Sequence, residues 1–490
     1  MSARHYPAAA RGRGARFAAL LPALLLAALG GCTVLGPDFQ APQTQLPQAW
    51  PAQEGAAGAV DLFWWDSFGD PLLPALIARA VAGNLDLQSA ASRWEQARAL
   101  RTGVGAAQQP QATADLSVTR TRNSQVGLLD PSGLKGADAY SVGRGGISAN
   151  WELDLWGRVR RNVEAADATV EAAQEQRGAI RLAVAAETAH AYIQLRAVQN
   201  IAALTQKNLQ IARSSQQLTA LRRQEGVATE LDVARAGGQV AAIEARLPAL
   251  EQRESQLVSA LGLLLAQPPQ ALAAELHAVA PIPAGPALAA LGLPGELAER
   301  RPDIRRASAE LHAATAGIGA AQADFYPRIS LGASIGSQAL QLSRLGAWDS
   351  RNYAAGPLLS LPLFDGGRLR GSLALSQARQ REAALAYRKT VLTAWHEVDE
   401  AAHAVRAQQR RRTHLGVAAG QTKLALGYAQ QQYSAGSVDF LAVLAAQDAL
   451  LAAEAALADG QCAAALAQVD LYKALGGGWQ ERNRAAAPAP

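Results

Sequence analysis

The 490-residue chain contains an internal duplication. Residues 84–110 and residues 301–327 both have a helical pattern, and both end at a proline. Because proline lacks a backbone N–H and clashes with the preceding turn, each helix is predicted to stop there. Two alternating runs and then long helical stretches follow each proline, and the series returns roughly 217 residues later. The sequence therefore predicts two copies of one architectural unit, with no linker that divides them cleanly.

Four runs of about ten residues alternate between apolar and polar side chains. They cover residues 112–121, 147–155, 328–337 and, less sharply, 353–364. In the second run every odd-numbered residue from Ile147 to Leu155 is apolar, and every even-numbered residue is polar. This period of two predicts strands with one apolar face. Pro357 and Pro362 blur the limits of the fourth strand, because proline cannot donate to a sheet ladder.

The rest of the chain is helical in pattern over unusual lengths. Between Val159 and Gln224 only Gly178 disfavours a helix, and some 65 residues at about 1.5 Å each would extend on the order of 100 Å. Further helices are predicted over residues 372–433 and 440–475. Amphipathic helices of this length need partners, and a self-contained coiled coil is one way to supply them. The strands between the helices argue against that alternative.

The first 31 residues have the pattern of a secretory signal peptide. Several arginines precede an apolar run over residues 17–29, which is too short to span a bilayer as a helix. The run leads into Leu29–Cys32, which resembles the bacterial lipobox and implies cleavage before Cys32 and attachment of lipid to it. The alternative is a plain signal with an incidental cysteine. Thr33 rather than aspartate follows, and the resemblance to sorted lipoproteins then favours the outer membrane.

The formal net charge of +5 does not indicate a nucleic-acid partner. Four of the positive charges belong to the predicted signal peptide: Arg4, Arg11, Arg13 and Arg16. The remainder is about +1, far from the concentrated basic face that nucleic-acid binding requires.

No residues group into a catalytic motif. Gly-x-Ser-x-Gly, His-Glu-x-x-His and a Rossmann loop in context are absent, and the glycines at 476–478 lack the lysine and spacing of a phosphate loop. Cys462 lies in a helical pattern and is interpreted as a packed thiol. His396 and His403 share a helical face, but no compact His/Cys set accompanies them, so solvated polarity is favoured over a metal site. We predict a non-enzyme without cofactor or metal.

The predicted strands have the length that a membrane-spanning strand needs. No stretch after the signal approaches 18 consecutive apolar residues, so strands rather than helices would have to cross a bilayer. Four strands cannot close a barrel, since about eight is the usual minimum, so two or three copies would have to associate. An ordinary soluble sheet is the alternative. Aromatic residues at or near the strand ends favour the membrane: Trp151, Trp156, Tyr326, Trp348, Tyr353 and Phe364.

Five sequence blocks, taken in order, are specific for one family. They are Cys32–Phe39, Phe63–Leu72, Trp151–Arg158, Arg300–Ile304 with Phe325–Pro327, and Val469–Trp479. Together they resemble the outer-membrane factors of tripartite efflux systems, in particular the OprM/NodT-type lipoproteins of the TolC superfamily.

The resemblance implies a membrane α+β fold. Each chain of a homotrimer would give four transmembrane β-strands to a shared barrel and long α-helices to a periplasmic helical barrel, with a mixed equatorial zone between them. It also implies a lipid-anchored protein of the outer membrane that extends into the periplasm. There it would passively conduct drugs or other small molecules received from an inner-membrane resistance-nodulation-division (RND) transporter through a periplasmic adaptor.

On this basis the chain is expected to have five segments. They are a signal peptide (1–31), a lipidated N-terminal segment with the start of the equatorial zone (32–83), a first repeat (84–283), a second repeat (284–478) and a flexible C-terminal tail (479–490).

Two glycine-containing turns are the candidate gate. Gly226 and Gly436 lie where the long helices turn back, so the turns are expected at the end of the hairpins opposite the strands, as a periplasmic tip. Three acidic residues of these turns would recur around a symmetry axis: Asp439, Glu230 and Asp232. A ring of three carboxylates can select cations and hold a constriction.

The gate has partners and an alternative. Arg222 or Arg223 could hold the constriction closed by pairing with these acids. The alternative is that the acidic turns only cap helices, since Thr229 and Asp439 follow glycine and precede apolar runs.

Two other functions stay open at this stage. The same duct could serve protein secretion or metal-ion export, because a passive channel conducts whatever its pump delivers. A structural periplasmic coiled-coil lipoprotein is an alternative of another class, and it predicts no conductance.

Overall fold

The computed structural model describes residues 34–42, 50, 60–126, 138–286 and 291–480. The chain divides into two compact units. The first takes the residues up to 41, 96–171 and 309–385, and the second takes 42–95, 172–308 and 386–490. Each unit therefore combines segments of both predicted repeats. The candidate lipid-attachment residue Cys32 lies outside the described residues.

The elements alternate as the duplication predicts. The strands are β1 (Gln111–Thr121), β2 (Tyr140–Leu153), β3 (Arg328–Ala339) and β4 (Arg351–Ser360). The helices are α2 (Leu72–Gly83), α3 (Leu85–Gly105), α4 (Arg158–Gln224), α5 (Glu230–Glu244), α6 (Leu247–Leu264), α7 (Pro269–Leu276), α8 (Leu297–Arg300), α9 (Pro302–Ala323), α10 (Arg368–Ser434) and α11 (Phe440–Ala474). Helices α4 and α10 are each 67 residues long, so the long helices that follow β2 and β4 have the same length.

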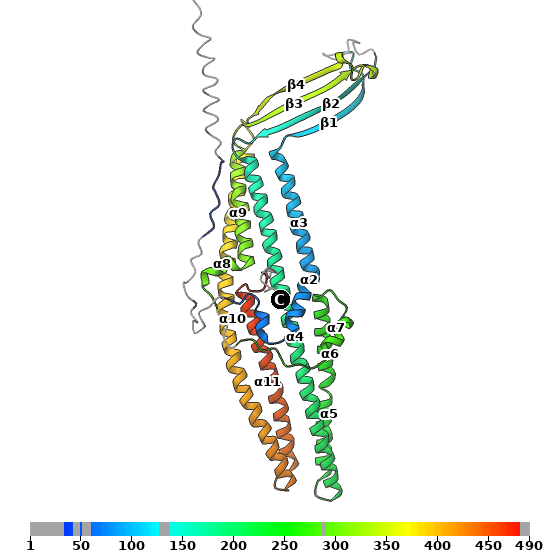
Figure 1. Cartoon of the computed structure of the whole chain (residues 1–490), viewed down its shortest axis with the longest axis vertical. Helices are drawn as coiled ribbons and strands as arrows, with labels where there is room; N and C mark the ends of the chain where they lie inside the picture. Colours follow the sequence, from blue (N-terminus) through cyan, green and yellow to red (C-terminus); the bar gives the residue numbers. More distant parts are fainter. Residues whose placement is uncertain (1–33, 43–49, 51–59, 127–137, 287–290, 481–490) are drawn as a thin grey trace, which may run out of the picture. The chain divides into compact units, whose positions relative to one another are not determined.

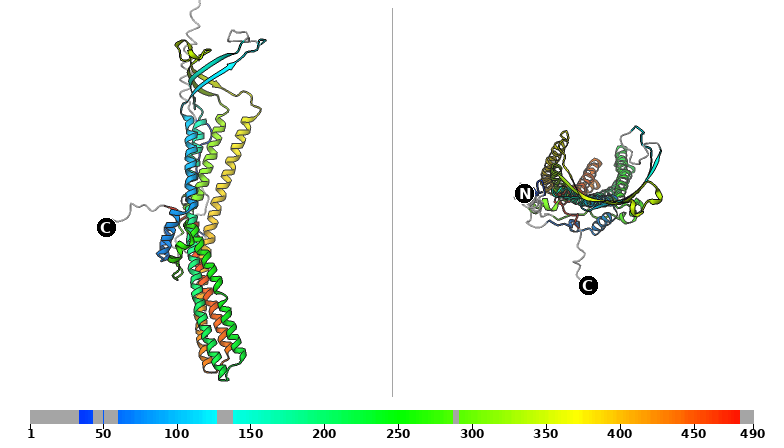
Figure 2. Two further views of the ribbon diagram at one scale, coloured as in Figure 1. Left: turned by 90° about the vertical axis from the view of Figure 1, so that its right-hand side faces the viewer. Right: turned by 90° about the horizontal axis from the view of Figure 1, so that it is seen from above.

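The four strands form one antiparallel sheet in the order β1-β2-β3-β4 (Figure 1). Viewed from above, the sheet is curved (Figure 2). Strand β2 begins at Tyr140, seven residues before its predicted start, because the run from Tyr140 to Gly146 pairs with β1 although its glycines interrupt the alternation. Strand β4 ends at Ser360 rather than Phe364, as the position of Pro362 explains.

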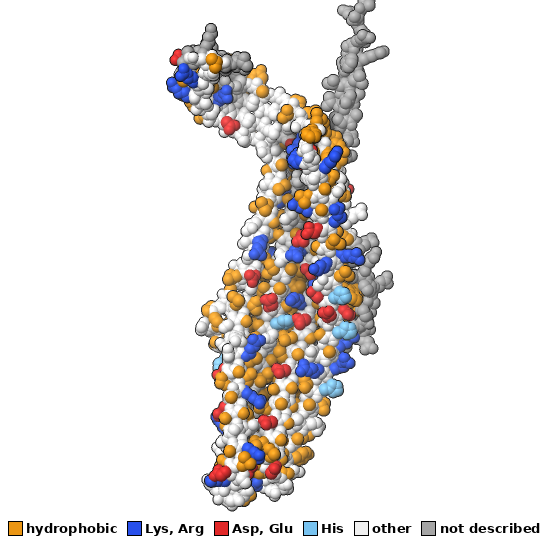
Figure 3. Space-filling view, turned by 180° about the vertical axis from the view of Figure 1, so that it is seen from behind, with side chains coloured by type: hydrophobic (Ala, Val, Ile, Leu, Met, Phe, Trp, Pro, Cys, Tyr) orange, Lys and Arg blue, Asp and Glu red, His pale blue; other side chains and the backbone are white. Residues whose placement is uncertain are grey.

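The register gives the sheet one apolar and one polar face. Ile147 pairs with Ile335, which pairs with Tyr353, and these three side chains share the apolar face. One residue along, Ser148 pairs with Ser334 on the polar face. Ile335 is 63% exposed and Tyr353 87%, so the apolar face is uncovered in the single chain. The predicted alternation is confirmed, and charged side chains are sparse between the ends of the sheet in Figure 3.

Helix α11 departs from the expectation that no helix after the signal peptide is apolar enough to cross a bilayer. By length and composition alone it could cross a membrane, because an 18-residue window has a mean hydropathy of 1.7 without any long unbroken apolar run. One third of that window is buried, and Ala465, Val469 and Tyr472 of this helix belong to a large buried core. A core helix satisfies the same criterion, and these buried contacts make the C-terminal part of α11 a core element of the second unit.

The core of the second unit joins the beginning and the end of the chain. The indole of Trp64 donates to the carbonyl of Gly477 at 3.1 Å and stacks on the ring of Tyr472 at a centroid distance of 5.7 Å. Beside this pair, the hydroxyl of Tyr192 donates to Asp70 at 2.7 Å and accepts from Arg196 at 3.0 Å. Two sequence blocks about 400 residues apart thus form one core, as the expected equatorial zone requires.

Candidate functional site

The turns that follow α4 and α10 have the same backbone structure. In each, the glycine N–H bonds to the carbonyl three residues back, and the next N–H bonds to the carbonyl five residues back. These bonds define the Schellman motif, in which glycine adopts the left-handed conformation. Gly226 has φ +77° and Gly436 has φ +72°. The duplication therefore extends to single hydrogen bonds at the candidate gate.

Two of the three candidate acids cap helices. Asp439 is the N-cap of α11 and accepts a hydrogen bond from the backbone of Ala442 at 3.2 Å. Thr229 caps α5, and Asp232 completes a capping box by accepting from the backbone N–H of Thr229 at 3.0 Å. Hydrogen bonds from the Thr229 hydroxyl and N–H lower the pKa of Asp232. The geometry thus assigns both aspartates a structural role at the start of a helix.

The third acid and both candidate arginines are paired within one chain. Glu230 forms an ion pair with Arg223. Arg222 instead donates to the carbonyls of Tyr433 at 2.8 Å and Ser434 at 3.0 Å, and its guanidinium lies 4.3 Å from the centre of the Tyr433 ring. A cation on the last carbonyls of a helix is favourable, because the unpaired carbonyls concentrate negative charge there. Arg222 therefore fastens the end of α4 to the end of α10.

A hollow of about 480 Å³ lies near these helix ends, between α4, α10 and α11. Its apolar lining includes Leu218, Tyr433, Phe440 and Val443. Lys207 of α4 also lines it. The hollow mixes apolar contacts with amide and hydroxyl groups, which suits contact with another protein surface.

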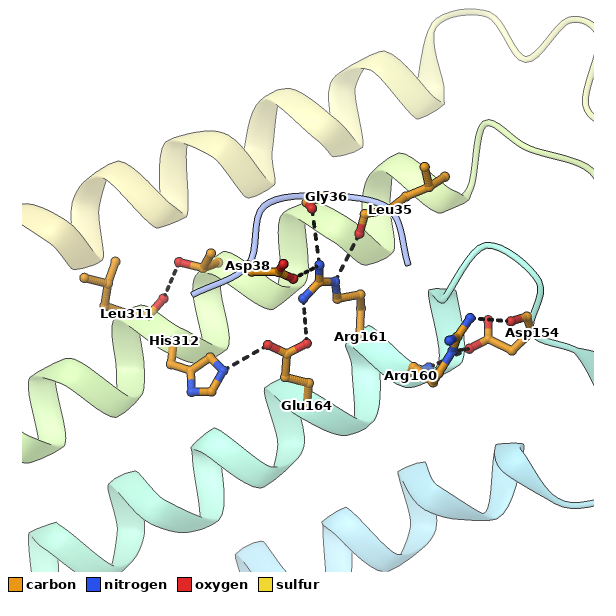
Figure 4. A network of polar contacts seen from close by, with 10 residues as sticks. Leu35, Gly36, Asp38, Asp154, Arg160, Arg161, Glu164, Leu311 and His312 are labelled. Carbon is orange, nitrogen blue, oxygen red and sulfur yellow. Dashed lines mark hydrogen bonds and ion pairs between the residues drawn. The ribbon is translucent and has the colours of Figure 1, made fainter. Parts of the chain in front are cut away.

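A second cluster of polar contacts holds the N-terminal strap, which we define as residues 34–41 (Figure 4). At its centre is Arg161, which is only 3% exposed. Its guanidinium donates to the carbonyls of Leu35 at 3.0 Å and Gly36 at 3.2 Å, and it forms ion pairs with Asp38 at 2.7 Å and Glu164 at 2.8 Å. Each nitrogen of the buried guanidinium thus has a hydrogen-bond partner, as burial of a charge requires.

The strap is also held by an aromatic contact. The ring of Phe39 stacks on His312 at a centroid distance of 4.4 Å, and His312 contacts Glu164 at 2.9 Å. The sequence analysis identified the strap only through its family block and did not predict the role of Arg161 or His312. The strap and these residues are more than 100 positions apart, so local sequence offers no signal for the contact.

Matching aspartates connect the strands to the long helices. Asp154, after β2, accepts from the backbone of Val159 and Arg160 at 2.9 and 2.8 Å. Asp365, after β4, accepts from Leu369 in the same way at 2.9 Å. Capping by an acid satisfies the first N–H groups of each helix and is favoured by its dipole.

Aromatic side chains gather at this junction. Trp156 lies 4.9 Å from Tyr326 between ring centres and donates to the carbonyl of Pro327 at 2.8 Å. An amphipathic pair of this kind suits the boundary between an apolar phase and water.

Within the described part of the chain, no group of three or more His, Cys, Asp or Glu side chains could hold a metal ion. His403 lies 3.9 Å from Asp399, one helical turn earlier. Cys462 is half-buried, and burial with a smaller contribution from Asp459 raises its pKa to about 11. A thiol with so high a pKa is unreactive at neutral pH, as predicted for a packed cysteine.

The fold and the sheet define an outer-membrane channel. The solved channel OprN superimposes with a TM-score of 0.84 at 34% sequence identity, over 92% of this chain and 100% of that structure. VceC of Vibrio cholerae gives 0.78 at 28% identity, over 86% of this chain and 100% of that structure.

Relatives of similar sequence are also outer-membrane proteins. The pyoverdine export outer membrane protein OpmQ of Pseudomonas putida is 34% identical over 442 residues, which are 89% of this chain and 92% of the relative. OprJ of Pseudomonas aeruginosa is 34% identical over 470 residues, 94% and 96% of the two chains. The family described as outer membrane efflux protein matches residues 76–267 and 293–477. The chain belongs to this family.

Proposed function

We propose that the protein is a homotrimeric channel that passively conducts drugs or other small molecules across the outer membrane. The observation that carries the proposal is the sheet. It has one exposed apolar face and one polar face, and its outer strands β1 and β4 each pair with a single neighbour in the described structure. In lipid, an unpaired strand edge leaves several backbone groups without partners, so the sheet must be closed.

Closure by identical copies fits the strand count. Three chains supply twelve strands from the four in each sheet, which exceeds the usual minimum of about eight. The family resemblance favours three copies over two. In such a barrel the apolar face contacts lipid, and the polar face lines a water-filled lumen.

The helix ends form the proposed periplasmic entrance. A periplasmic adaptor would dock against the hollow between α4, α10 and α11, and an inner-membrane RND transporter would supply both substrate and energy. Curated relatives are named for pyoverdine export and for toluene efflux. A small-molecule substrate of an efflux pump is the class we extend to this chain.

Gating is proposed at the same end. Three copies of Asp439 would face the axis, together with Glu230 and Asp232, and Arg222 would hold each α4 end against its α10 end. Opening would then require the two helix ends of each chain to separate. Lipid on Cys32 would anchor the assembly near the start of the N-terminal strap.

The decisive experiment is planar-bilayer conductance of the detergent-purified mature protein, with native mass measured in parallel. Discrete conductance steps from a species of three chains are expected. A silent, water-soluble monomer would instead support a periplasmic coiled-coil lipoprotein.

Adjacent residues of β3 supply a matched control. Ile335→Lys places a charge on the apolar face and should cost about 2–4 kcal/mol near the bilayer midplane. Ser334→Lys places the same charge on the polar face, where we expect assembly and conductance to persist. Equal tolerance of both variants would contradict the assignment of the faces.

A further inference from the structure

The polar face of the sheet carries few charges, and two of them have no ionic partner. Among the described strand residues, the register places Asp115, Arg144, Glu152 and Arg328 on this face. Glu152 forms an ion pair with Arg158 at 2.7 Å, and Arg328 forms one with Asp324 at 2.6 Å. Asp115 only accepts a long hydrogen bond from Thr113, at 3.5 Å, and Arg144 has no ion pair in the described structure.

These two charges are neighbours on adjacent strands. Asp115 stands opposite Gly146, and Arg144 stands opposite Ser117, two positions further along. Since a strand rises about 3.4 Å per residue, their attachment points are separated by roughly 7 Å along the sheet. Charges of opposite sign thus lie side by side without neutralising each other through a direct contact.

A hollow of about 260 Å³ lies between them on the same face. Both Asp115 and Arg144 line it, and Ser148 and Ser334 provide hydroxyl groups. The floor requires glycine: a Cβ on Gly146 would lie 2.9 Å from the Ile335 carbonyl oxygen, and one on Gly336 would come as close to that of Gly145. A side chain at either of these two positions therefore has no room in the floor of the hollow.

We propose that Asp115 and Arg144 are the charge-selecting residues of the outer part of the conduit, where they favour solutes that carry charges of both signs. The proposal rests on the proposed function, because it requires the polar face to line the pore. A cation alone meets the repelling guanidinium and an anion alone meets the repelling carboxylate. A zwitterionic solute can oppose each group with its own opposite charge while its body crosses the glycine floor.

Ser117 offers a local probe of this field, because it faces Arg144 across the strand pair. The test uses the full-length lipoprotein with Cys462→Ala, which removes the thiol of α11, and with Ser117→Cys as reporter. Its reaction rates are measured with a sulfonate-bearing and a trimethylammonium-bearing methanethiosulfonate. The ratio of the two rates reports the sign of the local potential.

We expect Arg144→Gln to lower the sulfonate-to-ammonium rate ratio, and Asp115→Asn to raise it, each by roughly three- to tenfold for unit charges some 7 Å apart in water. Arg120→Gln is the matched control, because Arg120 lies on β1 but on the opposite face. It should leave the ratio unchanged. The same variants should shift the reversal potential in a salt gradient in opposite directions.

The outcomes separate the two proposals. If the parent protein conducts but neither Arg144→Gln nor Asp115→Asn changes the rate ratio, the charge-selecting role is wrong and the channel stands. An equal effect of Arg120→Gln would also overturn the role. If the parent protein does not conduct at all, the proposed channel function itself fails.

Discussion

Gly36 and Gly319 touch so closely that neither position has room for a side chain. A Cβ on Gly36 would lie 2.3 Å from the Cα of Gly319, and a Cβ on Gly319 would lie 2.6 Å from the carbonyl oxygen of Leu35. Gly36 also has φ +91°, a conformation that L side chains rarely adopt. This contact lets the N-terminal strap approach α9 and brings its carbonyls within reach of Arg161.

Replacing Gly319 by alanine should therefore release the strap. We expect Gly319→Ala to accelerate proteolysis within the N-terminal strap, although alanine is the better helix former. Gly317→Ala is the matched control on the same helix, since nothing lies within 4 Å of a Cβ there. It should stabilise α9 by about 0.5–1 kcal/mol and leave the cleavage rate unchanged. Identical cleavage of the two variants would show that the close approach does not hold the strap.

Arg161 and Arg160 should differ sharply although they are adjacent. Arg161→Ala leaves Asp38, Glu164 and two carbonyls without their donor, and we expect a loss of about 2–4 kcal/mol. Arg160 is more exposed and pairs with Asp154 at 3.3 Å, so Arg160→Ala should cost less than about 1 kcal/mol. Thermal unfolding in detergent measures both. Similar losses would mean that the buried contacts of Arg161 do not stabilise the protein.

Tyr192 should make the second unit sensitive to alkaline pH. Burial raises its pKa to about 12, while hydrogen bonds to Arg196 and Asp70 act in opposite directions. The folded state therefore holds this proton more tightly than the unfolded chain. Its contribution to stability is complete below about pH 10, the ordinary value for tyrosine, and is lost as the pH rises towards 12.

Tyr192→Phe tests this directly. It should cost about 1–3 kcal/mol at pH 7, because Asp70 and Arg196 lose a partner, and it should weaken the loss of stability between pH 10 and 12. Tyr428→Phe, at a side chain that is 63% exposed, should change neither quantity. Chemical unfolding at a series of pH values is the measurement. An unchanged alkaline slope in Tyr192→Phe would assign that loss to other groups.

Substitutions of Asp439 can separate the effect of its negative charge from its role as the N-cap of α11. Asparagine and serine keep the N-cap but remove the charge, whereas alanine removes both and should cost about 1 kcal/mol. If the carboxylate ring holds the constriction, all three variants should raise single-channel conductance relative to the parent. A rise in Asp439→Ala alone would assign the effect to the helix cap, and no rise in any variant would exclude Asp439 from the gate.

The strands could be predicted because their information is local. Alternation along residues 328–337 and 147–155 depends only on neighbouring positions, and the register confirms it. The start of β2 was missed where glycines replace apolar residues, since a glycine has no side chain to mark a face. Helix limits followed the same rule: the turns at Gly226 and Gly436 were predicted, and their Schellman bonds were found there.

The contacts of Arg161 could not be predicted in this way. Its partners in the strap lie more than 120 residues earlier in the chain, and nothing in the local pattern distinguishes it from Arg160. The aspartates of the turns show the opposite difficulty. By sequence Asp439 fits both a cap and a gate, and Thr229 fits a cap. The structure shows both N-caps, and it adds Asp232 as the partner of Thr229 in a capping box, because these contacts are completed within one chain.

The alternation of the sheet limits how the gene can change in length. Inserting or deleting one codon within β3 would move every later side chain of that strand to the other face, so that Ile335 would meet water and Ser334 would meet lipid. Insertions or deletions of two codons would keep each side chain on its face. Insertions or deletions in the segments between strands would not exchange the faces at all. Length variation among natural variants is therefore expected to collect in the segments that join β1 to β2 and β3 to β4.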